Sequence, residues 1–243
     1  MKSHTFKKYA SLFIENIYNK IDLFHASRVR KFYQDKFIDC VIDVGSHKGE
    51  FINLICRDNV PIFSFEPQKS LQDALIKSTQ KKNVLEYFDI ALSSFQGEID
   101  LHINYLTSTS STLIPNEQSF WVKFKKLILG GSLTSAIEAV KVNTMDNVLF
   151  SRLDPFKSIL LKIDVEGAEG DVLLGAEKII DTHNIKYIQV EDSSYNTKNI
   201  TKTNFVSNFL IEKGFQESKS FIFPLLNFKD LIFIKKQQET KEI

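Results

Sequence analysis

The chain has 243 residues, with 31 Lys or Arg against 30 Asp or Glu, and its pI is about 7.7. This length fits one large domain, or one domain with an appendage. The 43% hydrophobic and 25% charged residues are typical of a globular protein and exclude a wholly disordered chain. A net charge of +1 disfavours a dedicated nucleic-acid binder, and two cysteines exclude a disulfide scaffold and a Cys/His metal motif.

Residues 1–39 differ in pattern from the rest of the chain, with eight Lys or Arg against four Asp or Glu. We predict an amphipathic helical appendage to a main domain at residues 40–243. The alternative is a helix that binds an anionic membrane surface or a second subunit. No apolar run is long enough for a signal peptide or a spanning helix, so we expect a cytoplasmic protein, with peripheral membrane association as the alternative. The apolar positions that recur every three or four residues are Phe6, Tyr9, Ala10, Phe13, Ile14, Ile17, Tyr18 and Ile21.

From residue 40 onwards, short apolar runs alternate with helical patterns. This alternation predicts a mainly parallel sheet with helices on both faces. The last two strands are too close for a helical crossover, so they should form an antiparallel hairpin. The predicted strands are residues 40–44, 61–65, 84–91, 159–165, 185–191, 221–226 and 231–235, and the predicted helices end near residues 57, 80, 180 and 213.

An insertion at about residues 96–157 separates the third and fourth strands. We predict strands at 98–104 and 141–144 within it. The Ser/Thr run at 107–112 is typical of a loop, and the segment at 120–126 is predicted to be a helix.

A glycine-containing turn follows the first strand, in the sequence Asp43-Val-Gly45-Ser-His-Lys-Gly49-Glu. Glycine permits a tight turn, and the amides at the start of the next helix are candidates for binding an anion. The G-x-x-x-G spacing lacks the dinucleotide fingerprint, and a plain tight turn explains it too. Glu66 ends the second strand, where a carboxylate can accept two hydrogen bonds from a ribose diol. Together, the loop and Glu66 predict a nucleoside-containing cofactor at the carboxyl edge of the sheet.

The strongest motif is Lys162-Ile-Asp164-Val-Glu166-Gly-Ala-Glu169, at the end of the fourth strand. An acid inside an apolar strand is costly unless it binds something, which singles out Asp164. Asp164 and Glu166 share a face if the segment stays extended. Glu169 is explained by the preference of acids for helix N-termini. A metal cluster ranks lower, because no His or further acid lies in register, and we predict no metal.

These motifs resemble those of the FkbM-type methyltransferases. The resemblance rests on DVGSHKGEF, FSFEP, FDIALSSFQGEIDLHI, SSTL, VNTMDNV and LLKIDVEGAEGDVLLGAEKII, in the family's order over residues 40–235. It implies a class I methyltransferase (Rossmann-like) fold, with a mainly parallel seven-stranded sheet and a C-terminal antiparallel hairpin, to which the chain adds the predicted N-terminal helix. The family often has Ala-Asn where this chain has Ser46-His47, and residues 1–39 and 113–140 lie outside the resemblance.

The resemblance also implies a cofactor, S-adenosylmethionine, and residues that bind it. A loop at residues 110–112 would close over the site. The implied cofactor residues are Asp43, which would order the first loop; Gly45 and Gly49, around the methionine portion; Glu66, at the ribose hydroxyls; Asp89, near the adenine; and Asp164, at the amino-acid end.

Methyl transfer from a sulfonium is an in-line displacement, so the enzyme mainly aligns the reactants, and a general base takes the proton of an alcohol acceptor. We expect this base at the carboxyl edge of the fourth and fifth strands. Glu166 and Glu191 are the candidates, and Asp192 is adjacent. His102 would serve if the insertion folds over the site, and His47 lies in the cofactor loop.

We therefore predict S-adenosylmethionine-dependent O-methylation of a hydroxyl on a carbohydrate, or on a glycan or glycolipid precursor. The expected partner is that small-molecule or glycan acceptor, and no nucleic acid. Aromatic residues and lysines at 120–126 would form an acceptor wall, although an ordinary surface helix explains them too. The alternatives are methylation of another small-molecule hydroxyl or nitrogen, a nicotinamide-dependent oxidoreductase, and a non-catalytic cofactor-binding or assembly module.

Overall fold

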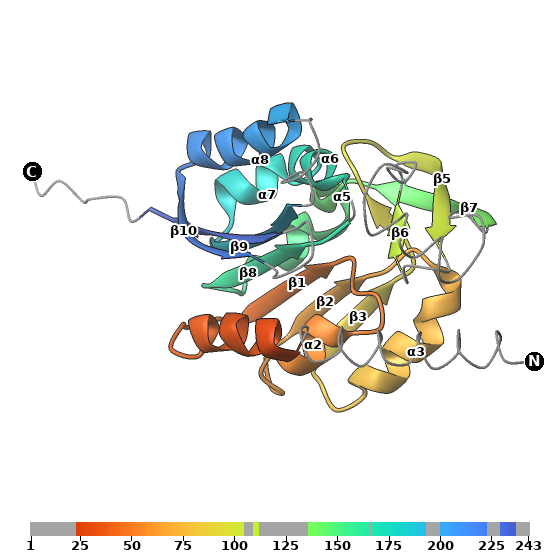
Figure 1. Cartoon of the computed structure of the whole chain (residues 1–243), viewed down its shortest axis with the longest axis horizontal. Helices are drawn as coiled ribbons and strands as arrows, with labels where there is room; N and C mark the ends of the chain where they lie inside the picture. Colours follow the sequence, from red (N-terminus) through yellow and green to blue (C-terminus); the bar gives the residue numbers. More distant parts are fainter. Residues whose placement is uncertain are drawn as a thin grey trace, which may run out of the picture.

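The computed structural model describes residues 23–104, 109–111, 136–165, 167–192, 200–222 and 229–236. Its centre is a seven-stranded sheet in the order β10-β11-β9-β8-β1-β2-β3 (Figure 1). The neighbours from β9 to β3 are parallel, and β11 runs antiparallel between β9 and β10. The predicted class I methyltransferase fold with its C-terminal hairpin is confirmed. The strands are β1 (Cys40–Val44), β2 (Ile62–Phe65), β3 (Val84–Phe88), β8 (Ile159–Ile163), β9 (Ile185–Asp192), β10 (Phe215–Ile222) and β11 (Lys229–Lys235).

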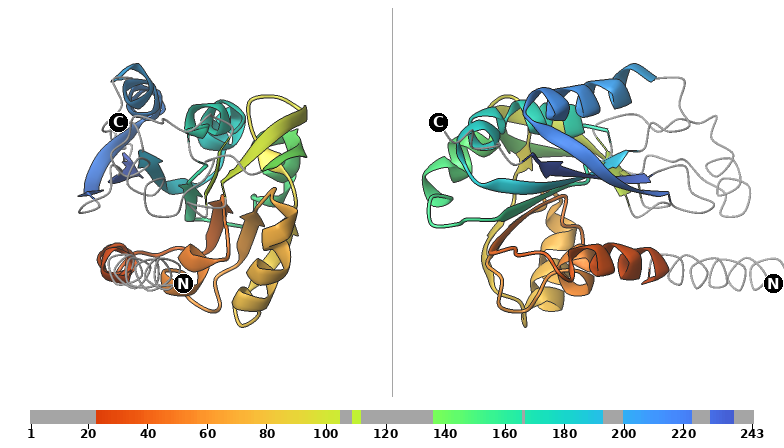
Figure 2. Two further views of the ribbon diagram at one scale, coloured as in Figure 1. Left: turned by 45° about the vertical axis from the view of Figure 1, so that its right-hand side comes forward. Right: turned by 90° about the vertical axis from the view of Figure 1, so that its left-hand side faces the viewer.

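Helices cover both faces of this sheet, and two apolar clusters fill the space beneath them (Figure 2). In β1, Ile42 and Val44 face the cluster under α6, α7 and α8, whereas Val41 faces the cluster under α2, α3 and the helix at residues 23–33. Asp43 shares the second face with Val41, because side chains alternate along a strand. The other helices are α2 (Glu50–Leu54), α3 (Lys69–Thr79), α5 (Met145–Leu149), the 3-10 helix η1 (Phe150–Arg152), α6 (Glu169–Leu174), α7 (Glu177–Thr182) and α8 (Ile200–Glu212).

Three strands of the insertion and the short strand β4 just before it form a second, four-stranded sheet in the order β4-β7-β5-β6. The loop predicted for the Ser/Thr run is wrong for residues 109–111, which pair with the end of β5. The edge of β5 supplies backbone hydrogen-bond partners there, and these outweigh the turn preference of serine and threonine. The strands are β4 (Ala91–Leu92), β5 (Gly97–Asn104), β6 (Thr109–Ser111) and β7 (Ala136–Asn143), and the helix predicted at 120–126 lies outside the described residues.

Two helix caps lie in the segment that follows this second sheet, and the second of them joins the segment to the main domain. The Thr144 hydroxyl accepts a hydrogen bond from the Asn147 amide at 3.1 Å and begins α5. The Asp146 carboxylate accepts from the amides of Lys178 and Ile179 at 3.1 and 3.0 Å and caps α7. The VNTMDNV motif therefore fixes the end of the insertion to α7, which follows β8 and α6 in the chain.

Two predicted elements are placed wrongly. The penultimate strand is Phe215–Ile222 rather than residues 221–226, because β10 is an edge strand whose exposed polar side chains hide it from an apolar pattern. The single helix predicted to run through residue 180 is two helices. The chain breaks at Gly175, where an added Cβ would lie 1.9 Å from the Ser93 carbonyl oxygen.

The predicted N-terminal helix is described only over residues 23–33, where Val29 and Tyr33 are buried against the main sheet. The apolar positions predicted between Phe6 and Ile21 lie outside the described residues. Within the described ranges, no helix has the length and apolar character needed to cross a membrane.

Candidate active site

The glycine loop lies between β1 and α2 and approaches the end of β8 closely. Gly45, His47 and Gly49 have φ values of 77°, 51° and 84°, all in the left-handed region. An added Cβ on Gly45 would lie 1.9 Å from the Asp164 carbonyl oxygen. The first glycine is therefore required both by its backbone conformation and by the neighbouring strand. Histidine is among the residues that tolerate positive φ better than most, which fits its place in this loop.

The amides of this loop are used within the protein. Those of residues 45–49 donate to the carbonyls of Phe65 and Ser46 and to the carboxylates of Glu66 and Glu50. An anion would therefore not find free amides at these five positions. Binding of an anion at the amides that begin α2 (Glu50–Leu54) stays a prediction.

Glu66 follows β2 directly and is buried, at 6% exposed. One carboxylate oxygen accepts from the His47 amide and the other from the Gln68 amide, each at 2.9 Å. Burial raises the pKa of Glu66, and the two amides oppose that shift. The carboxylate is thus held in a fixed orientation, and each oxygen retains a second lone pair for an incoming hydroxyl.

Asp89 follows β3 and is exposed at the same edge of the sheet. The Glu66 amide donates to the Phe88 carbonyl at 3.0 Å, so the two acids follow neighbouring strand ends. Beneath them, the rings of Phe65 and Phe88 are stacked with centroids 4.3 Å apart. The structure therefore brings Glu66 and Asp89 to adjacent positions, as the sequence predicts for one cofactor cleft.

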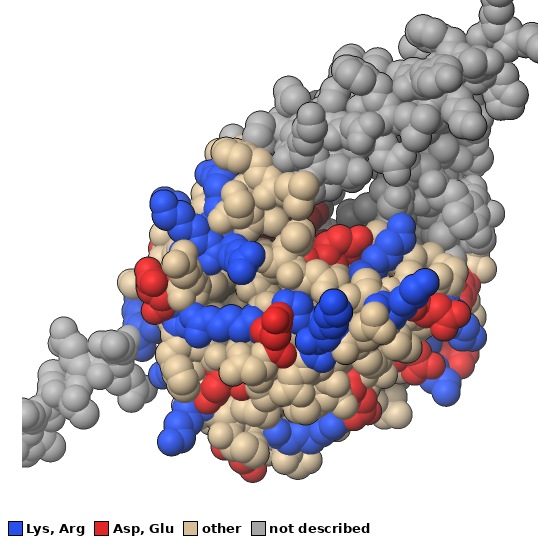
Figure 3. Space-filling model, turned by 90° about the horizontal axis from the view of Figure 1, so that it is seen from below, with Lys and Arg blue, Asp and Glu red and all other residues tan. Residues whose placement is uncertain are grey.

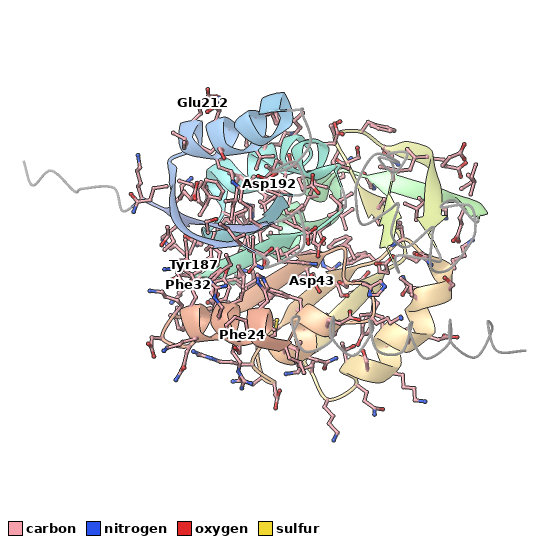
Figure 4. All side chains as sticks on the ribbon, in the orientation of Figure 1. Phe24, Phe32, Asp43, Tyr187, Asp192 and Glu212 are labelled. Carbon is pink, nitrogen blue, oxygen red and sulfur yellow. The ribbon has the colours of Figure 1, made fainter. Side chains whose placement is uncertain are left out.

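Lys162 connects the glycine loop to the acids and was not given a role by the sequence. Its Nζ lies 3.2 Å from Asp43 Oδ1 and 3.3 Å from Asp164 Oδ2, and it donates to the Gly45 carbonyl at 2.7 Å. Asp43 and Lys162 are buried, whereas 34% of the Asp164 side chain is exposed. Figure 4 shows Asp43 near the end of β1. One ammonium is therefore shared by two carboxylates, and only Asp164 opens outward.

The charges of this cluster depend on one another. Burial alone would lower the pKa of Lys162, but Asp164 and Asp43 together raise it above its ordinary value. Burial raises the pKa of Asp43, and the Lys162 ammonium opposes that shift. Lys162 therefore stays protonated and forms a buried ion pair with Asp43.

This cluster corrects the interpretation of Asp164. Its place in an apolar strand does not require an external ligand, because Lys162 lies two residues earlier on the same face. Lys162 also pairs in parallel register with Asp43 on β1. A lysine inside a buried strand was the signal in the sequence, since a buried ammonium needs a carboxylate partner.

Of the two predicted bases, only Glu191 lies among the described residues. Glu166 lies outside the described residues. Glu191 is half-buried near the end of β9 and opposite Asp230 of β11. Asp192 lies on the other face of the sheet, toward α6, with Lys229 Nζ at 3.5 Å (Figure 4). The side chain of His102, on β5, is not described.

Glu169 is the further acid that sequence reasoning set aside. It begins α6, and one of its carboxylate oxygens accepts from the Gly167 amide at 2.8 Å. Burial raises the pKa of Glu169, and the negative charges of Asp164 and Asp192 add to that shift. Its carboxylate is thus near the carboxyl ends of β8 and β9, in surroundings that favour the protonated form.

The chain is similar in sequence to known methyltransferases. The methyltransferase FkbM domain matches residues 43–217. A curated relative, the hexuronic acid methyltransferase AglP of Haloferax volcanii, is 25% identical over 165 residues, which are 68% of this chain and only 60% of that protein. Similar solved structures include an rRNA methylase from Streptococcus thermophilus (10% identity, 86% of this chain and 94% of that one, TM-score 0.47). Another is the magnesium protoporphyrin IX methyltransferase of Synechocystis PCC 6803 (8% identity, 92% and 88%, TM-score 0.46). Because the family model spans more than two thirds of the sequence, the chain belongs to the FkbM methyltransferase family.

Proposed function

We propose that this protein is an S-adenosylmethionine-dependent O-methyltransferase that acts on a carbohydrate hydroxyl, in a free sugar or in a glycan or glycolipid precursor. The observation that carries the proposal is the row of carboxylates at one sheet edge, in a chain of the FkbM family. Glu66, Asp89 and Asp164 follow three strands of that edge. The relative from Haloferax volcanii is named for a sugar acid, which supports a carbohydrate acceptor.

The residues present fit S-adenosylmethionine by charge and by hydrogen-bonding capacity. Asp43, Lys162 and Asp164 bring two carboxyl groups to one ammonium, and the exposed part of that cluster is the Asp164 carboxylate. A carboxylate there suits an ammonium group, through a charge-assisted hydrogen bond. The oriented oxygens of Glu66 suit a vicinal diol. When bound, the cofactor supplies an activated methyl group on a sulfonium.

The task of the protein is then alignment and proton removal. Glu66 would bind the ribose of the cofactor and Asp164 its amino-acid end, and Lys162 keeps the glycine loop and Asp164 in a constant relative position. Glu166 and Glu191 remain proposed bases. Glu169 joins them, because a carboxyl whose pKa is raised by burial accepts a proton more readily near neutral pH.

Isothermal titration of the purified protein with S-adenosylmethionine and S-adenosylhomocysteine tests the cofactor. We expect micromolar binding of both. A folded protein that binds neither, or that binds a nicotinamide cofactor instead, would overturn the proposal.

Transfer of a labelled methyl group to a panel of acceptors tests the substrate class. The panel should contain hexuronic acid glycans, neutral glycans, and non-carbohydrate alcohols and amines. Labelling of the glycans supports carbohydrate O-methylation, and labelling restricted to the amines would assign methylation of nitrogen. Glu169→Gln should lower kcat while cofactor affinity stays unchanged, whereas full turnover would remove Glu169 as the base.

A further inference from the structure

Helix 23–33 has an unusual surface for a helix that packs on a domain. It carries Arg28, Arg30 and Lys31 and no acidic residue. Its buried side holds Val29 and Tyr33, but Leu23 and Phe24 at its start are 57% and 58% exposed. Figure 3 views the molecule from this side, with the Lys and Arg side chains in blue.

The start of this helix is firmly attached to the end of the β10–β11 hairpin. His25 Nε2 lies 2.5 Å from Asp230 Oδ2, and the two side chains are buried. The Arg28 guanidinium lies over the rings of Phe221 and Phe24, at 5.0 and 5.9 Å from their centroids. The start of the helix, which carries the exposed apolar side chains, is therefore fixed to the main sheet.

The hairpin end carries a further exposed apolar residue, on the opposite face of the sheet from helix 23–33. Ile222 is 51% exposed and pairs with Lys229, which in turn pairs with Asp192 at the carboxyl end of β9. Leu23 and Phe24 form what we call the edge patch. It lies at the edge of the sheet that carries the candidate active site. Three strand spacings, about 14 Å, separate β10 from β8.

We propose that the edge patch and the basic face of helix 23–33 bind the surface of an anionic lipid bilayer. Exposed aromatic and aliphatic side chains beside Arg and Lys are the chemistry of interfacial membrane helices. The chain continues from Leu23 into 22 further residues with four Lys against two acids and with apolar residues every three or four positions. A second copy of the chain fits less well, because two such basic surfaces would repel each other.

The edge patch and the carboxylates lie at the same edge of the sheet, which connects membrane binding to the proposed function. A bilayer bound there would present membrane-anchored molecules to that edge. The acceptor class that follows is a carbohydrate carried on a lipid, and this step rests on the proposed function. Bilayer binding itself does not.

Co-sedimentation of the full-length protein with vesicles tests the surface. We expect binding to vesicles of phosphatidylglycerol and phosphatidylcholine, weakening with salt, and little binding to phosphatidylcholine alone. Phe24→Glu should weaken binding by more than about tenfold. Arg30→Gln with Lys31→Gln should weaken it by about fivefold for each charge removed and leaves the apolar residues intact.

A matched control is Phe37→Glu, because Phe37 is 65% exposed at the opposite edge, where its carbonyl accepts from Ser158 just before β8. This variant should bind vesicles as the wild type does. Absence of vesicle binding by the wild type, or equal losses in Phe24→Glu and Phe37→Glu, would overturn the proposal. So would a concentration-dependent dimer that Phe24→Glu abolishes, without vesicle binding. Titration with S-adenosylmethionine on the same samples separates failure of this proposal from failure of the methyltransferase assignment.

Discussion

Two polar clusters lie on the same face of the main sheet. They differ in charge and in exposure to solvent. The first lies beside the glycine loop, where the Lys162 ammonium is shared by Asp43 and Asp164. All three of its side chains are ionisable. One of them reaches solvent, since a third of the Asp164 side chain is exposed.

The second cluster lies under helix 23–33 and is closed. The Tyr33 hydroxyl donates to Gln189 at 3.2 Å, Gln189 donates to Asp230 at 3.1 Å, and His25 completes the group. All four residues are at most 9% exposed.

The difference shows what each cluster contributes. Buried charges with partners inside the protein hold elements together, and a closed cluster does little else. An ionic cluster with one exposed carboxylate also offers a charge to a ligand. Substitutions in the two clusters should therefore separate stability from cofactor binding.

The largest expected effect is that of Lys162→Met. It leaves Asp43 as a buried, unpaired carboxylate and should lower the free energy of unfolding by about 3–5 kcal/mol. Urea unfolding measures this loss. The control is Lys213→Met, because Lys213 pairs with Glu177 and Asp181 at the surface, where such pairs contribute about 0–1 kcal/mol. Equal losses in the two variants would contradict the central role of Lys162.

Gly45→Ala should come next. Its Cβ would overlap the Asp164 carbonyl, and its φ is positive, so we expect a loss of about 2–4 kcal/mol together with weaker cofactor binding. Gly214→Ala separates the two causes: its φ is 82°, but its nearest neighbour, Lys235 Cε, is 4.0 Å from the added Cβ. Thermal unfolding should show only about 1 kcal/mol for Gly214→Ala. A similar loss at both sites would mean that the close approach to β8 is unimportant.

Glu66→Ala should act mainly on the cofactor. Loss of a charge-assisted hydrogen bond should weaken S-adenosylmethionine binding by about 1.5–3 kcal/mol, as titration would measure. Because Glu66 also accepts from the amides of His47 and Gln68, stability should fall by about 1 kcal/mol as well. Glu86→Ala is the control, because Glu86 lies within β3 rather than after the end of a strand. Its carboxylate pairs with Arg152. Unchanged cofactor affinity in Glu66→Ala would refute its assigned role.

Tyr33→Phe should have the smallest effect, about 0.5–1.5 kcal/mol of stability and none on cofactor affinity. Burial raises the pKa of Tyr33 well above its ordinary value of 10. In alkali the unfolded chain loses this proton first, so the wild type should lose stability as the pH rises above about 10. Unfolding followed at pH 9 and pH 11 should show a smaller decline for Tyr33→Phe, and identical declines would contradict the burial of this hydroxyl.

Local patterns predicted much of the fold for a simple reason. Strands buried on both faces are continuous apolar runs, and a ligand-binding edge places Glu66 and Asp164 directly after such runs. The patterns failed where burial is one-sided or where pairing is non-local. β10 is an exposed edge strand, Thr109–Ser111 becomes a strand through β5, and α6 ends at Gly175, where the Ser93 carbonyl leaves no room for a Cβ.

The sequence by itself determined the order of the elements, the antiparallel hairpin, and the acids that end the strands, because each depends on neighbours along the chain. Only the tertiary structure decided that Asp164 has an internal partner, that Glu169 lies among other carboxylates, and that helix 23–33 begins beside Asp230. The contacts of Asp43 with Lys162 and of His25 with Asp230 depend on the packing of segments that are more than one hundred residues apart. A buried charge can be recognised in the sequence, but its partner is chosen by the packing of the whole sheet.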